Sequence, residues 1–214
     1  MPNLCLNTLT IVGEKESIEA FYNAVAKDKK SDKINILETL YPVPAELEGK
    51  EKQWSKDKTF EQILDQQTEN FTNQYDWCCA KWGSKWGDYD HNDVNYDVGD
   101  NKLYFSFTTA WCPATEGFVE VSKQFPDLIF MMTYEESGCQ FCGVVAIQDG
   151  KIIADVDGEW PEYPDEDDYE DEDEWIEDCD NHSEKVDEEL KKIKDEIIDE
   201  HFQDYKFKEL FNDE

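Results

Sequence analysis

Seven cysteines and three histidines are the residues of this sequence best suited to metal or redox chemistry. Cys139 and Cys142 have the spacing of many zinc sites, but a structural zinc needs about four ligands, usually two such pairs or a pair with added histidines. None of His91, His182 and His201 has pair spacing. In an alternating strand the two cysteines would also point to opposite faces. We therefore interpret them as half-buried strand residues, in preference to zinc or redox chemistry, and expect no cofactor.

A second candidate site is the aromatic segment "WGSKWGDYDHND". Lys85 lies between two tryptophans there and is placed for cation–π contacts. A dyad of His91 with Asp88 or Asp93 would be the catalytic alternative, yet no nucleophile motif or phosphate-cradling loop accompanies it. We favour the interpretation in which the tryptophans cap the core of a sheet and the glycines allow tight turns. The residues that could line a pocket here are Trp82, Lys85, Trp86, Asp88 and His91.

The third candidate is an acidic tract. Residues 155–180 hold sixteen carboxylates and no Lys, Arg or His. The Asp-x-Asp-Gly start at Asp155 is typical of a calcium loop, but the later ligand positions and the twelfth-place Glu are missing. A helix over 165–180 would present roughly one charge per 2 Å, and an extended chain roughly one per 4.4 Å, against about one per 1.7 Å in duplex DNA. The aromatic residues within the tract are Trp160, Tyr163, Tyr169 and Trp175.

The charge balance excludes several partners. The formal net charge is −33, of which residues 1–150 supply −12 and residues 151–214 supply −21, and there is no arginine. Such a charge repels nucleic acid and anionic membrane surfaces, so we expect neither as a direct partner. The N-terminus lacks the pattern of a signal peptide and no apolar stretch approaches 18 residues, so we expect no membrane span. The odd cysteine count then favours reduced thiols in a cytoplasm.

The order of hydrophobic patterns predicts an α+β fold. A strand over about 4–12 precedes a helix with Ile18, Phe21, Tyr22 and Val25 on one face. After a long insertion come a hairpin, a helix between Pro113 and Pro126, and two or three strands with a turn at Asp149–Gly150. The order β-α-(insertion)-β-β-α-β-β is that of a ferredoxin-like split βαβ, a mostly antiparallel sheet with helices on one face.

An amphipathic helix is expected after the acidic tract, because apolar residues recur there at steps of four, three and four. Asn181 or Ser183 is the candidate N-cap. We therefore divide the chain into a ferredoxin-like domain at 1–156 with an insertion at about 28–90, the acidic tract at 157–180, and a C-terminal amphipathic helix at 181–214. The residues of the apolar stripe are Val186, Leu190, Ile193 and Ile197.

Six segments occur in an order that resembles a known family. They are "MPNLCLNTLTIVG", "YPVPAEL", "WGSKWG", "FTTAWCPATEGF", "FPDLIFMMTYEESG" and "FCGVV". Together they resemble the YubB-like, ferredoxin-fold proteins carried by bacteriophages and conjugative plasmids, over roughly residues 1–156. The resemblance implies a mobile-element origin and the ferredoxin-like fold, but no established chemistry, so no catalytic residues follow from it. The acidic tail from about residue 157 lies outside the pattern.

These observations favour a phage-encoded interaction protein that is not an enzyme. We expect the acidic tract to occupy the basic channel of a host nucleic-acid-binding defence protein, a CRISPR or restriction nuclease, as a DNA mimic. In the alternative, the sheet or the "WGSKWG" segment binds a protein or small ligand and the acid only aids solubility. The expected partner-binding residues are Asp155, Asp157, Glu159, Trp160, Glu162, Tyr163, Asp165, Glu166, Asp167, Asp168, Tyr169, Glu170, Asp171, Glu172, Asp173, Glu174, Trp175, Glu177 and Asp178.

Overall fold

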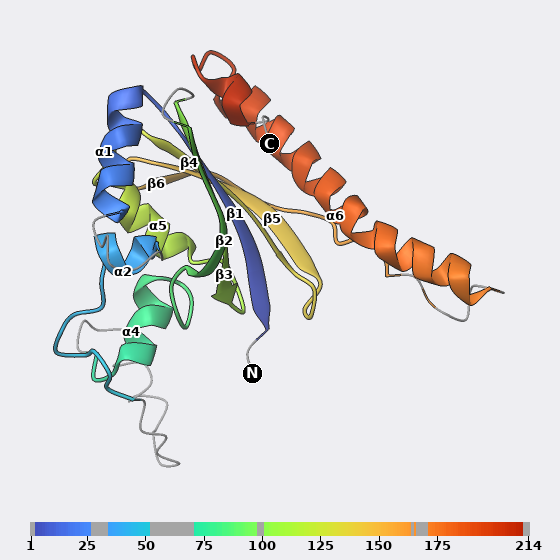
Figure 1. Ribbon diagram of the computed structural model, residues 1–214, viewed down its shortest axis with the longest axis horizontal. Coiled ribbons are helices and arrows are strands. Elements are labelled where there is room, and N and C mark those ends of the chain that lie inside the picture. The colour runs from blue at the N-terminus through green and yellow to red at the C-terminus, as the bar shows by residue number, and fades with distance from the viewer. Residues whose placement is uncertain are drawn as a thin grey trace.

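A six-stranded antiparallel sheet forms the centre of the protein (Figure 1). The computed structural model describes residues 3–26, 34–51, 71–97, 101–163, 165 and 171–211. Within the sheet the strands follow the order β2-β3-β1-β4-β5-β6. The strands are β1 (Leu4–Val12), β2 (Tyr89–Asp97), β3 (Lys102–Ala110), β4 (Ile129–Glu136), β5 (Phe141–Gln148) and β6 (Lys151–Asp157).

The first four strands have the ferredoxin-like order. β3 pairs with both β1 and β2, and β4 pairs with the other edge of β1, all antiparallel. β1 and β2 therefore run parallel with β3 between them, which is the split βαβ arrangement and confirms the predicted fold. β5 and β6 extend the sheet beyond β4, joined by a turn at Asp149 and Gly150 with φ angles of 48° and 70°. Positive φ at both positions is typical of a tight hairpin turn.

Helices α1 (Lys15–Val25), α2 (Ile36–Leu40) and α5 (Thr115–Ser122) cover one face of this sheet (Figure 1). Alternate residues of the strands point into the core on this side. The short helix α4 (Gln74–Lys81) extends the same layer. The core between the sheet and these helices is rich in aromatic residues, among them Phe21, Trp82, Phe105, Phe107, Phe118 and Phe130.

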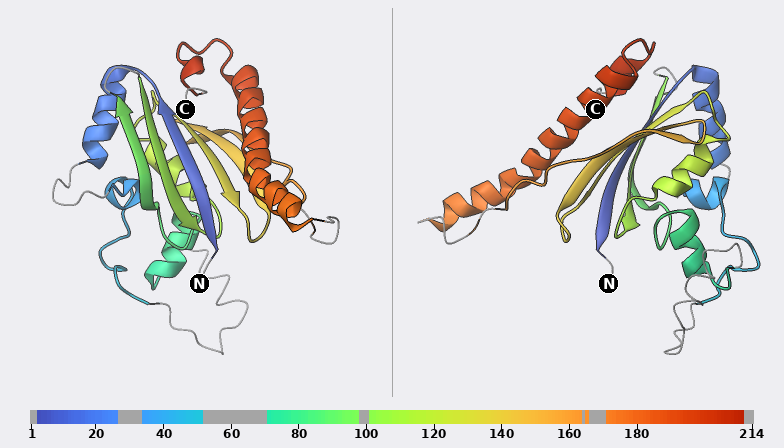
Figure 2. Two further views of the ribbon diagram at one scale, coloured as in Figure 1. Left: turned by 45° about the vertical axis from the view of Figure 1, so that its right-hand side comes forward. Right: turned by 180° about the vertical axis from the view of Figure 1, so that it is seen from behind.

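Helix α6 (Glu172–His201) packs on the opposite face of the sheet (Figure 2). Its predicted stripe of Val186, Leu190, Ile193 and Ile197 is buried. The stripe has partners there because β4 and β5 carry apolar side chains on both faces, which a one-sided cover would leave exposed. The sheet therefore has helices on both faces once α6 is included. The residues that the sheet contributes to this second core are Val12, Ile129, Met131, Cys142, Val144 and Ala146.

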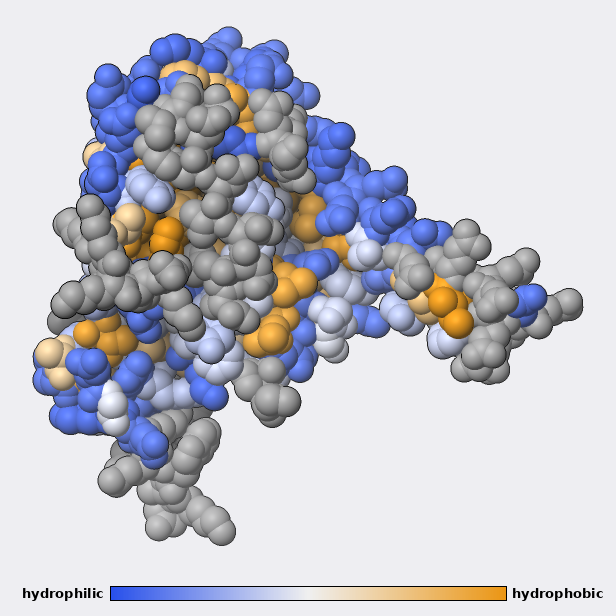
Figure 3. Space-filling model, viewed as in Figure 1, coloured by the Kyte–Doolittle hydropathy of each residue, from blue (hydrophilic) through white to orange (hydrophobic). Residues whose placement is uncertain are grey.

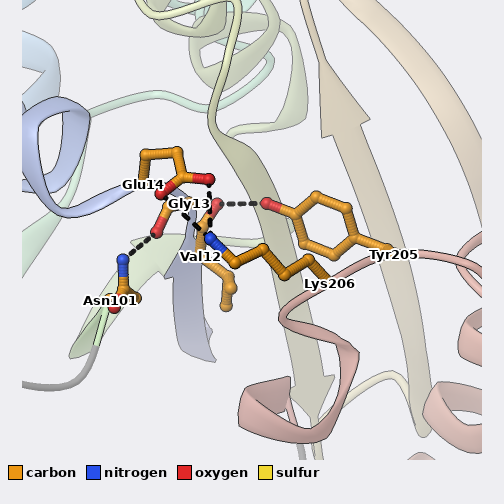
Figure 4. A network of polar contacts seen from close by, with 6 residues as sticks. All are labelled: Val12, Gly13, Glu14, Asn101, Tyr205 and Lys206. Carbon is orange, nitrogen blue, oxygen red and sulfur yellow. Dashed lines mark hydrogen bonds and ion pairs between the residues drawn. The ribbon is translucent and has the colours of Figure 1, made fainter.

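The segment after α6 returns to the end of β1, as Figure 4 shows. The Tyr205 hydroxyl donates to the carbonyl oxygen of Val12 at 3.4 Å, and the Lys206 ammonium lies 3.1 Å from a carboxylate oxygen of Glu14. Burial, followed by the charge of Glu14, raises the pKa of Tyr205 to about 12. The 3-10 helix η3 (Lys208–Phe211) then places Phe211 in the second core. The aromatic C-terminal segment therefore fixes the end of α6 to the sheet.

The helix boundaries differ from those predicted for the C-terminal region. α6 begins at Glu172, inside the acidic tract, and ends at His201. Asn181 and Ser183 therefore lie within the helix and are not its cap, which corrects the expectation. The early start is reasonable physically, because carboxylates near a helix N-terminus interact favourably with its dipole. Within the part of the chain that the structure describes, no helix is both long and apolar enough for a bilayer crossing.

Candidate functional site

The two closely spaced cysteines do not form a site. Cys139 is exposed in the β4–β5 turn, with its sulfur 3.8 Å from the side-chain nitrogen of Asn3. Cys142 is buried on the face that α6 covers, and burial raises its pKa to about 11. A buried thiol with a raised pKa is a poor nucleophile and a poor metal ligand. Among residues that the structure describes, no three His, Cys, Asp or Glu side chains gather to hold a metal ion.

The "WGSKWG" segment is part of the core. Trp82 is buried, and its indole nitrogen donates to the carbonyl oxygen of Tyr41 at 2.9 Å. The buried carboxylate of Asp88 accepts hydrogen bonds from the backbone amides of Ile36 and Leu37 at 2.5 and 2.8 Å. These are the first amides of α2, so Asp88 satisfies groups that a helix leaves without intrahelical partners. A hydrogen-bonded, helix-anchoring Asp88 speaks against the dyad with His91, whose side chain lies outside the description.

Lys85 makes the cation–π contact that its position between two tryptophans suggested. Its ammonium lies 5.2 Å from the centre of the Trp86 ring. Trp86 and Lys85 are half-buried, whereas Trp82 is one of the largest fully buried side chains. The segment therefore divides into an inner Trp82 that fills the core and an outer pair at the surface, and these residues do not converge on one pocket.

The first two acidic residues of the tract face away from α6. Asp155 and Asp157 belong to β6, and Asp157 accepts a hydrogen bond from the Tyr134 hydroxyl at 3.2 Å. Tyr134 belongs to the core beneath α1 and α5, on the other side of the sheet. Burial, reinforced by Asp157 and Glu116, raises the pKa of Asp155. Asp155 and Asp157 therefore lie on the opposite face of the sheet from α6.

The next part of the tract folds back along α6. The amide of Gly158 donates to the carbonyl oxygen of Cys142 at 2.9 Å. Trp160 then packs against the second core, and its ring centre lies 5.4 Å from that of His182 on α6. Tyr163 lies 5.0 Å from the same imidazole. The aromatic residues at 160 and 163 thus hold the tract to the domain, where sequence analysis had expected them to anchor a partner.

His182 is the residue of this region that sequence analysis missed. It is buried, and its Nε2 lies 3.0 Å from the carbonyl oxygen of Pro161. Its burial could have been predicted from the sequence, because His182 lies one turn before Val186 and so continues the apolar stripe of the helix. Beside this contact the surface forms a hollow of about 630 Å³. The hollow is lined by Glu159, Trp160, Pro161, Glu162, Lys185 and Glu189.

The N-terminal part of α6 carries the densest charge that the structure places on a regular element. From Glu172 to Glu184 the helix has seven acidic residues and no cation. This part projects beyond the sheet (Figures 1 and 2). At about 1.5 Å per residue it spans about 20 Å, or roughly one carboxylate per 3 Å of axis, close to the 3.4 Å spacing along one DNA strand. Of the predicted residues, Glu166, Asp167, Asp168, Tyr169 and Glu170 lie outside the description, as do the side chains of Glu172, Asp173, Glu174 and Glu177.

The ferredoxin-like order of the strands agrees with a comparison to known families. A family model described as a ferredoxin-like domain in Api92-like protein matches residues 81–194, just over half of the chain. The chain belongs to this family. The match runs from the end of α4 through the acidic tract into α6, so the Api92-like domain includes the segment expected to lie outside the family pattern. This fits the packing of α6, which completes the second core.

One solved structure is similar to this Api92-like chain. It is the crystal structure of a protein api92 from Yersinia pseudotuberculosis, which is 11% identical, with 77% of this chain and 100% of that chain covered and a TM-score of 0.40. No curated protein matches the sequence at a significant level. The family model alone shows the Api92-like family, while the bacteriophage and plasmid attribution stays a prediction.

Proposed function

We propose that the protein is a non-enzymatic interaction module that binds a basic nucleic-acid-binding groove of another protein. The projecting part of α6 takes the place of the nucleic acid, with carboxylates in the positions of phosphates. The observation that carries the proposal is the run of seven acidic residues without Lys or Arg from Glu172 to Glu184 on one continuous helix, of which Asp178 is paired with Lys185 just beyond the run. A host defence nuclease is the class of partner that the sequence favours.

Packing of the tract gives this helix a fixed direction. His182 and the stripe that begins at Val186 hold α6 against the sheet, while the residues before them extend outward. A preorganised line of charge loses less conformational entropy on binding than a free acidic tail does. The aromatic contacts of Trp160 and Tyr163 with His182 support the same geometry, because they attach the tract to α6.

Affinity capture with a charge-matched control tests the proposal. The probe is the immobilised full chain in bacterial lysate, compared with the variant Glu172→Gln, Glu174→Gln, Glu177→Gln and Glu184→Gln. The control carries the same number of substitutions at exposed glutamates on other elements, Glu16, Glu46, Glu48 and Glu51. We expect the wild type and the control to retain nucleic-acid-binding proteins that duplex DNA displaces, and the α6 variant to lose them.

Salt dependence and nuclease inhibition give two quantitative measurements. Binding of a captured protein should weaken by about tenfold or more between 50 and 200 mM salt, because charge contacts release counterions. Purified restriction and CRISPR nucleases should be inhibited by the wild type and not by the α6 variant. If the α6 variant captures the same proteins as the wild type, and duplex DNA does not displace them, the proposal is wrong.

A further inference from the structure

The sheet face beside α6 has an exposed apolar patch that the second core leaves uncovered. We propose that this patch is a docking surface for a cationic amphipathic segment of the partner protein, which places apolar side chains on the sheet and cations against α6. This inference rests on the proposed function, because both require a partner with a basic surface. We assign to the patch the exposed side chains of Leu4, Leu6, Tyr89 and Trp111.

Strand pairing places three of these residues on one face. Leu6 is paired with Thr108 on β3 and with Glu135 on β4, and Tyr89 is also paired with Thr108. Cross-strand partners point to the same side of a sheet. Glu135 is in turn paired with Cys142, which lies in the core beneath α6. The cross-strand series that runs from Tyr89 through Leu6 to Cys142 therefore begins on a part of the sheet that α6 does not cover and ends beneath α6.

These side chains are more exposed than large apolar residues on a strand usually are. The exposed fractions are 52% for Leu4, 49% for Leu6 and 57% for Tyr89. α6 packs over β5 and β6, and the segment after it contacts β1 at Val12, which is the opposite end of that strand from Leu4 (Figure 2). Figure 3 shows apolar side chains at the surface on this side, with hydrophilic residues along α6. Grouped apolar exposure rimmed by polar residues is typical of an interaction surface.

Trp111 provides an independent observation at the same end of the sheet. Its backbone has a φ of 73°, a region that costs energy for a bulky residue, and 49% of its surface is exposed. The conformation is held by the hydrogen bond from its amide to the carbonyl oxygen of Asn3 at 3.1 Å, next to Leu4. A strained backbone that keeps an indole at the surface is a feature found at ligand-contacting positions.

The charge beside the patch identifies the occupant. A hollow of about 330 Å³ is lined by Leu4, Leu6, Glu135 and the β4–β5 turn, so carboxylate and leucine side chains share one depression. Glu135 is also paired with Cys142, which lies in the core that α6 covers, so its carboxylate stands between the leucines and the acidic helix. A second copy of this chain, at −33, would bring more negative charge to an acidic rim. A cationic amphipathic segment matches both the leucines and the carboxylates.

Two synthetic peptides test the inference on the full chain. One alternates lysine and leucine, and the other has serine in place of every leucine at the same charge. Titration into the ¹⁵N-labelled protein at 150 mM salt should give amide shifts on β1 and β3 with the leucine peptide only. Its affinity should fall at least fivefold in the variant Leu6→Ser and Trp111→Ser, while the serine peptide binds both proteins alike.

The outcomes separate this inference from the proposed function. If the Leu6→Ser and Trp111→Ser variant binds the leucine peptide as the wild type does, and the α6 variant binds it less, the docking surface is wrong and the acidic helix stands. If neither variant changes the affinity, both proposals fail. A wild type that sediments as a dimer and becomes monomeric in the Leu6→Ser variant would assign the patch to self-association and overturn the docking proposal. Because Leu6 and Trp111 are half-exposed, the substitutions leave the buried cores intact.

Discussion

The Nε2 atom of His182 lies 3.0 Å from the carbonyl oxygen of Pro161, and this contact joins the acidic tract to the long helix that follows it. The rings of Trp160 and Tyr163 approach the same imidazole. The tract is therefore held to α6 by its aromatic and backbone groups. The expected contact of these aromatic residues with a partner stays a prediction.

Replacement of Trp160 by alanine should destabilise the protein by about 2 kcal/mol, less than the 3–5 kcal/mol of a fully buried tryptophan because the side chain is only half-buried. Tyr163→Ala is the matched control, since Tyr163 contacts the same imidazole but is exposed, and should cost less than about 1 kcal/mol. Urea unfolding monitored by circular dichroism measures both values. Equal effects of the two substitutions would mean that the tract is not packed on α6.

Substitution of Asp88 by alanine should destabilise the fold by about 2–3 kcal/mol, because two buried amides of α2 lose their acceptor. Asp88→Asn keeps one acceptor oxygen and should cost less. Chemical denaturation gives both free energies of unfolding. If Asp88 instead served only as a catalytic acid, its removal would leave stability unchanged, and this outcome would contradict the anchoring role.

Glu135→Gln should raise the melting temperature at pH 7. Burial, together with Asp187 and against the opposing influence of His182, raises the pKa of the Glu135 carboxyl. A carboxyl with a raised folded-state pKa favours the fold when protonated, so this contribution is present below the ordinary value of about 4.3 and is lost as the pH rises through the folded-state pKa. The gain from Gln should therefore shrink toward pH 4. Thermal unfolding across pH 4–8 checks this, and a destabilised variant at pH 7 would contradict it.

The neighbouring Glu136→Gln should have the opposite effect. Burial alone would raise the pKa of this carboxyl, but hydrogen bonds from the Cys139 thiol, the Gly138 and Cys139 amides and Asn3 outweigh it and lower the pKa. The amides donate at 2.8 and 2.7 Å. A lowered pKa stabilises the fold above the unfolded-state value and the benefit is lost as the pH falls through the folded-state value. The melting temperature of the variant should be several degrees lower at pH 7, with the difference shrinking in acid; equal melting temperatures at pH 7 would refute it.

Alternation and turn chemistry were sufficient to predict most of the sheet. The expected strand at 4–12 matches β1 at Leu4–Val12, and the turn at Asp149–Gly150 joins β5 to β6. The apolar stripe of α6 was also predictable, because a 3.6-residue period is specific over several turns. These features depend on residues close in sequence, so a single chain suffices to find them.

The candidate site was harder to predict, because it depends on which face of the sheet each residue occupies. Nothing local separates Asp157, which points toward Tyr134, from Glu159, which lies beside α6. The start of α6 at Glu172 was missed because repulsion between carboxylates argues against a helix, while packing near His182 supports one. The patch joins Leu6 on β1 to Tyr89 on β2, about eighty residues further along the chain, and only the strand register places them on one face.

Translation on the ribosome makes the sheet before the helix that covers its second face. Until residues 186–211 have left the ribosome, the apolar side chains of Val12, Ile129, Met131 and Val144 are exposed to solvent. Exposed apolar surface of this kind makes an incompletely folded domain prone to aggregation. The next residues to emerge are the acidic ones, which give the unfinished chain a strong negative charge while it waits. The order of segments therefore means that the acidic residues leave the ribosome before the part of α6 that covers this face of the sheet.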